Sequence, residues 1–205
     1  NSIFLIIALL LIIIIQPAID LIGHYNQRLS LPESMASIEN WIKQGESEAE
    51  KTVNLLFGDK SLVGLISNLL IIAIVAGLAE ELFFRGCLQQ IIEKIFKNKH
   101  VAIWITAFIF SAIHFQFYGF IPRLLLGALL GYLFVWSGNI WVPIIVHTLN
   151  NAIGVLLSYF FYGTPQYESI SEGWINNLWI IIPSFVISTF LIFILIRKQK
   201  QTIIE

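Results

Sequence analysis

Residues 77–86 read GLAEELFFRG, which places two adjacent glutamates and an arginine inside one of the most apolar regions of the chain. The 205 residues are 57% hydrophobic and only 12% charged, with a mean hydropathy of +0.81. Soluble domains carry roughly a quarter charged residues, so this composition is typical of an integral membrane protein. Ionisable residues at membrane depth cost several kcal/mol each and usually face a protein interior, a cavity or one another. The stretch therefore predicts a polar site inside a membrane bundle.

Six apolar segments approach the roughly 20 residues that a helix needs to cross hydrocarbon. They lie at residues 3–22, 62–84 or beyond, 101–117, 124–136, 140–161 and 174–196. The fourth is short, and its Gly127 and Gly131 stand four apart, which permits close helix packing. Residues 23–60 contain six acids and scattered apolar residues, a pattern typical of an interfacial helix. The sequence predicts a single all-α domain over 1–205, a polytopic membrane helical bundle with about six transmembrane helices plus that interfacial helix.

Lysine and arginine near the ends of spans predict the orientation of the bundle. They cluster in one loop and in the C-terminal tail: Lys94, Lys97, Lys99, Arg197, Lys198 and Lys200. With six spans both clusters lie on the same side, so both termini are expected to be cytoplasmic and residues 23–60 and 163–173 to face outward. The first apolar run lacks a small-residue cleavage pattern and is expected to be a span, not a signal peptide. The net charge of -1 gives no indication of nucleic-acid binding, and the single Cys87 cannot form an internal disulfide.

Polar residues occur on three of the expected spans: Glu80, Glu81 and Arg85, then His114, then His147, Asn150 and Asn151. A helix rises 1.5 Å per residue, so Glu80 and His114 both lie roughly 20 Å from the lysine-bearing loop that joins their spans. His147 lies roughly 13 Å from the next turn on the same side of the membrane. The three groups are therefore at similar depth and can meet. Glu81 and Arg85 are four apart and can pair on one helix face, whereas Glu80 is turned away by about 100°. Each group also has a structural interpretation, as an ion pair, a packing histidine or an interhelical hydrogen bond.

Three motifs stand in order on these spans: EELFFR fits E-E-x-x-x-R, FSAIH fits F-x-x-x-H, and HTLNN contains H-x-x-x-N from His147 to Asn151. Together they resemble the CPBP family of intramembrane proteases, which includes CAAX prenyl endopeptidases and bacterial relatives associated with bacteriocin self-immunity and abortive infection. The resemblance covers about residues 62–157, the expected protease core. It implies an integral protein of a bacterial cytoplasmic membrane that cleaves a membrane-associated peptide or protein, prenylated or CAAX-like.

The resemblance also implies roles for the polar residues. The catalytic set is Glu80, His114, His147 and Asn151, with Glu81 and Arg85 in support. Glu80 would act as general base on a water that it holds with His114. His147 and Asn151 would stabilise the oxyanion.

Whether a metal takes part is left open by the sequence. Glu80, His114 and His147 could supply a His₂Glu zinc set, but the H-E-x-x-H spacing is absent, and a glutamate-and-water mechanism that requires no cofactor is preferred. A non-catalytic membrane immunity or scaffold protein of the same fold is an alternative. So is a proton-coupled transporter, although the chain shows no inverted repeat. Substrate identity, oligomeric state and the role of residues 23–60 cannot be read from the sequence.

Overall fold

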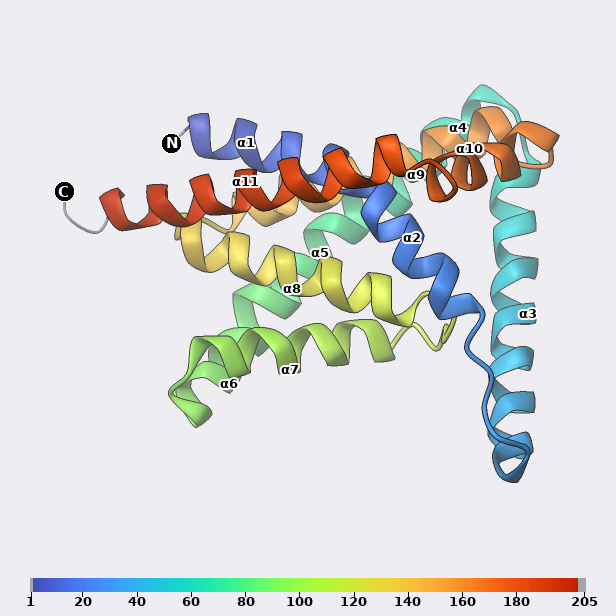
Figure 1. Cartoon of the computed structure of the whole chain (residues 1–205), viewed down its shortest axis with the longest axis horizontal. Coiled ribbons are helices and arrows are strands. Elements are labelled where there is room, and N and C mark those ends of the chain that lie inside the picture. Colours follow the sequence, from blue (N-terminus) through green and yellow to red (C-terminus); the bar gives the residue numbers. More distant parts are fainter. Residues whose placement is uncertain (1, 203–205) are drawn as a thin grey trace.

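The computed structural model describes residues 2–202, apart from the side chains of residues 168–172 and 200–202. Within this range the chain is helical and contains no strand, so the all-α prediction is confirmed. The elements are α1 (Ser2–Ile14), α2 (Gln16–Gln27), η1 (Glu33–Met35), α3 (Ala36–Gly58), α4 (Leu62–Asn68), η2 (Leu69–Val75), α5 (Ala76–Phe83), η3 (Phe84–Leu88), α6 (Gln89–Phe96), α7 (Lys99–Ala112), α8 (Phe120–Ser137), α9 (Trp141–Phe161), α10 (Pro165–Ile175) and α11 (Leu178–Thr202). Most run roughly alongside one another as a bundle (Figure 1).

Membrane-spanning length is reached by fewer helices than the sequence suggested. In the described part of the chain the long apolar helices are Leu62–Phe96, Phe120–Ser137, Trp141–Phe161 and Leu178–Gln199. α1 and α2 make a fifth span only if they count as one, because they meet at a bend of 42°. The count of six is not confirmed, since α7 has 14 residues and reaches only about 21 Å, short of the roughly 30 Å of hydrocarbon. The expected span 101–117 ends early because the chain turns at Phe115, which has a φ of 53°.

The second span is one long helix whose hydrogen-bonding pattern changes along its length. It begins at Ser61, whose Oγ accepts a hydrogen bond from the backbone N–H of Gly64 at 3.0 Å. Two segments, η2 and η3, are π-helical, and they flank the α-helical α5 that carries both glutamates of the opening motif. π-helical turns recur at functional sites because the wider turn changes the direction of side chains and carbonyls. The motif is thus presented by a short segment between two wide turns.

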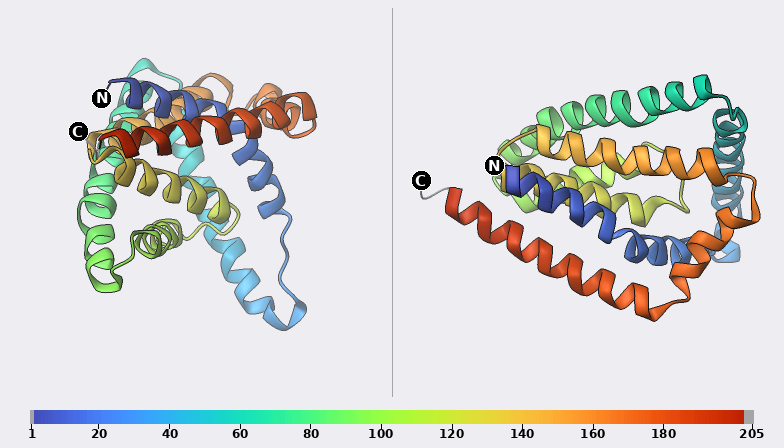
Figure 2. Two further views of the ribbon diagram at one scale, coloured as in Figure 1. Left: turned by 60° about the vertical axis from the view of Figure 1, so that its left-hand side comes forward. Right: turned by 90° about the horizontal axis from the view of Figure 1, so that it is seen from above.

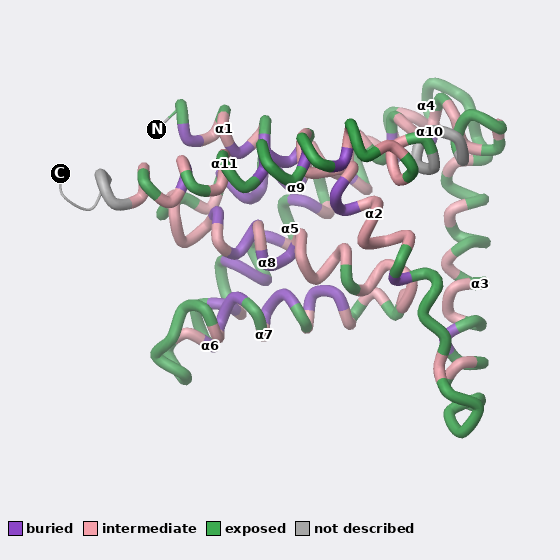
Figure 3. The backbone as a smooth tube through the Cα atoms, in the orientation of Figure 1, coloured by how far each residue is buried: buried purple, intermediate pink, exposed green. Residues whose placement is uncertain are grey.

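The largest core cluster joins four helices that are distant in sequence. One fully buried side chain comes from each of α1, α8, α9 and α11: Leu11, Leu133, Val146 and Leu195. Figure 3 shows the buried residues on the sides of α1, α7 and α8 that face other helices. Seen from above, α1, α9 and α11 lie next to one another along the bundle (Figure 2). This packing fixes α9, which carries His147, against the N-terminal helices.

Gly127 and Gly131 permit close approach of α8 to its neighbours, as predicted. A Cβ placed on Gly131 would lie 2.9 Å from Gln89 Oε1 and 3.0 Å from the side chain of Ile103. One placed on Gly127 would lie 3.1 Å from the ring of Phe110. Larger residues would push α8 away from both α6 and α7.

The segment between the first two spans forms the helix α3, which runs across the direction of the bundle helices at one end of the molecule (Figures 1 and 2). Its Ile42 is buried, while Ile38 and Trp41 are exposed. A surface helix with exposed apolar side chains fits the interfacial position predicted for residues 23–60.

Both ends of the described chain and the α6–α7 turn lie at the opposite end of the molecule from α3 (Figure 1). The turn carries Lys97, and the end of α11 carries Arg197 and Lys198. The side chain of Lys200 lies outside the described residues. The positive clusters therefore share one side, as the orientation argument requires, and their assignment to the cytoplasm stays a prediction.

Candidate active site

Glu81 and Arg85 form the predicted ion pair in the centre of the bundle. Their side chains are both 0% exposed, with Arg85 Nη1 2.7 Å from Glu81 Oε1. The same carboxylate oxygen accepts a hydrogen bond from His147 Nδ1 at 2.8 Å, a contact that the sequence did not predict. Arg85 Nη2 also donates to the carbonyl of Gly127 at 2.7 Å. Glu81 and Arg85 thereby tie the second span to α8 and α9.

Glu80 points into a cavity of about 450 Å³, which we call the Glu80 cavity. Its polar lining consists of Glu80, His114, Arg123, His147, Asn150 and Asn151. Glu80 Oε2 lies 3.8 Å from His147 Nε2, and the Glu80 side chain is 30% exposed. Two carboxylates, Glu80 and Glu81, and two guanidinium groups, Arg85 and Arg123, therefore lie in or beside this cavity. The structure thus brings together the four residues expected to be catalytic in one cavity.

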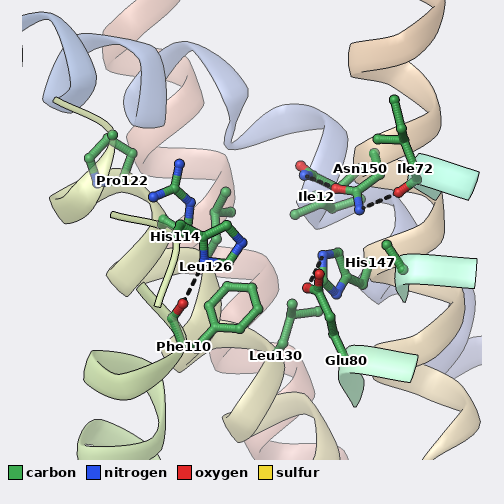
Figure 4. A pocket seen from close by; sticks show the side chains of 14 residues that line it. Ile12, Ile72, Glu80, Phe110, His114, Pro122, Leu126, Leu130, His147 and Asn150 are labelled. Carbon is green, nitrogen blue, oxygen red and sulfur yellow. Dashed lines mark hydrogen bonds and ion pairs between the residues drawn. The ribbon is translucent and has the colours of Figure 1, made fainter. Parts of the chain in front are cut away.

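His114 follows the last turn of α7 and faces the cavity from the side opposite Glu80 and His147 (Figure 4). Its Nδ1 lies 2.7 Å from the carbonyl oxygen of Phe110. A carbonyl can only accept, so Nδ1 carries the proton and Nε2 is the nitrogen left for another partner. In His147 the carboxylate of Glu81 fixes the ring in the same way. Both histidines are therefore oriented through Nδ1.

The two asparagines, Asn150 and Asn151, both line the Glu80 cavity. Asn151 Nδ2 donates to the carbonyl of Ile72 in η2 at 3.0 Å. Asn150 Oδ1 accepts from Gln16 Nε2 at 2.9 Å. An amide nitrogen carries two hydrogens, so Asn151 keeps one donor besides the bond to Ile72. The asparagines connect α9 to the second span and to α2.

The turn that holds His114 is fastened by residues from outside the expected protease core. Asn26 is buried and donates from Nδ2 to the carbonyl of Phe117 at 2.8 Å, while its Oδ1 accepts from the backbone N–H of Ile121 at 2.9 Å. Glu46 Oε1 in α3 accepts from the backbone N–H of Tyr118 at 2.8 Å. Sequence reasoning missed both residues, because one polar residue in a polar segment carries no signal of a contact some 70 to 95 positions away.

Arg123 is a further residue that the sequence did not indicate. It lies in the first turn of α8 and lines the Glu80 cavity. Its Nη2 donates to Gln116 Oε1 at 2.8 Å, while Nη1 is buried with no hydrogen-bond partner in the described part of the chain. The expected span began at residue 124, so Arg123 was assigned to the flank of a span, where an arginine is ordinary. Gln16 and Asp20 lie within the expected span 3–22, but they were not included among the polar residues of the spans.

The alternative zinc set fits this arrangement poorly. Glu80, His114 and His147 line the same cavity and leave Nε2 of each histidine available, which suits a metal ligand. However, no three His, Cys, Asp or Glu side chains in the described part of the chain lie close enough together to hold a metal ion. As placed here, these three side chains do not form a zinc site.

The part of the chain that carries the Glu80 cavity is similar to known proteins. Residues 62–153 match the family model of the Rce1-like type II CAAX prenyl endopeptidases. The chain is 32% identical over 102 residues to the uncharacterized protein YpbD of Bacillus subtilis (strain 168), covering 48% of this chain and 47% of that protein. It is 31% identical over 116 residues to an uncharacterized 24.3 kDa protein of Escherichia coli, covering 53% and 52%. The chain thus spans about half the length of the curated relatives it matches, and no solved structure matches it.

Proposed function

We propose that the chain is an intramembrane endopeptidase that hydrolyses its substrate with a glutamate-activated water, because residues 62–153 match the family model of the Rce1-like endopeptidases. The substrate would be a membrane-associated protein or peptide, prenylated or CAAX-like. The observation that carries the proposal is the position of Glu80, which faces His147 across a cavity that His114 also lines. We place the protein in a bacterial cytoplasmic membrane with both termini cytoplasmic, as the lysine and arginine clusters favour.

Hydrolysis begins with a water held between Glu80 and His114. The Glu80 carboxylate takes a proton from this water as its oxygen bonds to the carbonyl carbon of the substrate. The electron pair of the carbonyl moves onto its oxygen. When the tetrahedral intermediate collapses, the carbon–nitrogen bond breaks and Glu80 passes the proton to the leaving amine.

The developing oxyanion needs donors that are already in place. His147 supplies one, because Glu81 holds its Nδ1–H and turns Nε2 toward the cavity, where a proton on Nε2 can be donated. Asn151 supplies a second through the amide hydrogen that does not bond Ile72. Glu81 and Arg85 position this machinery and do not touch the substrate, since both are fully buried.

The proposal is tested by cleavage of membrane and prenylated peptides with purified protein in lipid nanodiscs. We expect Glu80→Gln to lower kcat/KM by about 10²-fold or more, because a neutral amide cannot act as the base. Glu93→Gln, on α6 of the same long helix and away from the cavity, is the matched control and should retain full activity.

Equal turnover by wild type and Glu80→Gln would contradict the proposal. If well-folded wild-type protein cleaves none of the peptides, a non-catalytic immunity or scaffold role becomes the better interpretation. Proton uptake into proteoliposomes that depends on Glu80 would instead favour a transporter.

A further inference from the structure

A second cavity of about 450 Å³, which we call the Asp20 cavity, adjoins the Glu80 cavity. The two share the wall residues Ile72, Asn150 and Asn151. Two hydrogen bonds run through this wall: Asn151 donates to the Ile72 carbonyl, and Gln16 donates to Asn150. A substrate chain bound with its scissile bond beside Glu80 therefore has the Asp20 cavity as a neighbour.

The Asp20 cavity contains an acidic side chain without a partner in the described part of the chain. Asp20 lies on α2, is half-buried, and has no hydrogen-bond or ion-pair partner among the described residues. Lys60 is near this region, but its ammonium group donates to the carbonyls of Ser158 and Tyr159. A carboxylate partly removed from water without a partner either takes up a proton or is stabilised by a bound cation.

Aromatic side chains form part of the remaining lining of this cavity. Phe57 comes from α3, and Tyr167 and Trp174 come from α10. Tyr162 connects them, with its ring centroid 6.2 Å from that of Phe57 and 5.5 Å from that of Tyr167. Aromatic rings attract cations through their negative faces. An unpaired carboxylate beside such rings is the chemistry that recognises an organic cation.

We propose that the Asp20 cavity binds a positively charged side chain of the substrate, lysine or arginine, close in sequence to the scissile bond. Asp20 supplies the counter-charge, and Phe57, Tyr167 and Trp174 supply the aromatic walls. The shared wall with the Glu80 cavity requires this side chain to lie near the cleaved bond. The inference rests on the proposed protease function for its substrate, but the binding site itself depends only on the cavity and its lining.

The first experiment measures binding without cleavage. A fluorescent prenylated peptide carries lysine, or its neutral isostere norleucine, at one position at a time along its length. Binding to the Glu80→Gln variant is measured in nanodiscs of phosphatidylglycerol, which lack a cationic lipid headgroup. We expect lysine at one position to bind about tenfold more tightly than norleucine. The preference should disappear in Glu80→Gln/Asp20→Asn and remain in Glu80→Gln/Asp20→Glu.

The matched control is Asp59→Asn, which makes the same change of charge at an exposed aspartate before α4 and should leave the preference intact. Asp20→Lys should reverse the preference, so that a peptide with glutamate binds more tightly than one with lysine. Repeating the measurement in phosphatidylcholine nanodiscs tests the other source of an organic cation. Loss of the lysine preference there, with binding of the choline headgroup dependent on Asp20, would assign the cavity to lipid and overturn the substrate proposal.

The second experiment measures kcat/KM for the same peptides with Glu80 intact, and it separates the two proposals. If wild type cleaves the lysine and norleucine peptides equally well, and Asp20→Asn has the same kcat/KM, the proposed role of the Asp20 cavity is wrong and the protease function is supported. If the protein binds the lysine peptides in a way that needs Asp20 but cleaves none of them, the result supports the cation-binding role of the Asp20 cavity and contradicts the proposed protease function. If Asp20→Asn does not fold, Asp20→Lys decides instead, and a lysine preference that persists in this variant overturns the inference.

Discussion

At the scale of single residues, Glu81 is the carboxylate on which the site depends for its geometry. One of its oxygens accepts from both Arg85 and His147, and neither Glu81 nor Arg85 is exposed. Glu80, one position earlier, has only the longer 3.8 Å approach to His147. Two adjacent glutamates thus occupy different environments: Glu81 is buried and binds two donors through one oxygen, and Glu80 faces a cavity.

Removing Arg85 leaves the buried Glu81 carboxylate short of its cationic partner. We expect Arg85→Ala to destabilise the fold by about 3–5 kcal/mol, the range for breaking a buried ion pair. The measurement is folded yield and the midpoint of denaturation in detergent, with Lys94→Ala on the exposed end of the same helix as control. Loss of activity with full stability would instead show that Arg85 takes part in the chemistry.

Independence from metal is a second expectation at this scale. Because Glu80 can act as base on water without a Lewis acid, we expect cleavage to persist after treatment with a chelator and extensive dialysis. The rate is compared before chelation, after it, and after zinc is restored. Activity that is abolished and then recovered with zinc would show that Glu80, His114 and His147 rearrange to bind the ion.

At the scale of elements, α5 and α9 are held together at Gly77. A Cβ at this position would lie 2.6 Å from Thr148 Oγ1 and 3.1 Å from the Thr148 backbone nitrogen. Gly77 precedes Glu80 by one turn of α5, and Thr148 follows His147 on α9. The contact therefore sets the separation of the two residues that face each other in the Glu80 cavity.

We expect Gly77→Ala to reduce activity strongly and to destabilise the protein by about 1–3 kcal/mol, because the backbone of α9 must shift. Gly86→Ala is the control in the same long helix, since its Cβ would have only the Glu81 carbonyl at 4.0 Å. That change should be neutral or stabilising by up to about 1 kcal/mol. A Gly77→Ala variant as active and stable as wild type would mean that the separation of α5 and α9 is not critical.

At the scale of the whole molecule, the N-terminal segment completes a site whose motifs all lie further along the chain. Asn26 and Glu46 hold the turn after His114, and Gln16 contacts Asn150. None of these three residues falls within the matched region 62–153. The position of His114 therefore depends on residues from outside the matched region.

We expect Asn26→Ala to lower kcat/KM about tenfold, because two backbone groups of the His114 turn lose their buried partner at about 1–3 kcal/mol. Tyr25→Ala, at an exposed neighbour on α2, is the control and should have little effect. Full activity in Asn26→Ala would show that the turn holds its shape unaided.

The sequence predicted the parts of this molecule that depend on local periodicity and on the cost of buried charge. It predicted the all-α bundle, the Glu81–Arg85 pair and the close packing at Gly127 and Gly131. It could not predict the second contact of Glu81 with His147, because that contact depends on how α9 rotates against α5. Arg123 was missed because hydropathy sets the edge of a span only to within a few residues.

The 14 residues of α7 leave His114 inside the depth that lipid tails normally fill. A bilayer adapts to so short a hydrophobic element by thinning beside it, at a small free-energy cost for each ångström of mismatch. Water then reaches the end of α7 more readily in a thin membrane than in a thick one. By this argument, the length of the surrounding acyl chains affects how much water reaches the turn that carries His114.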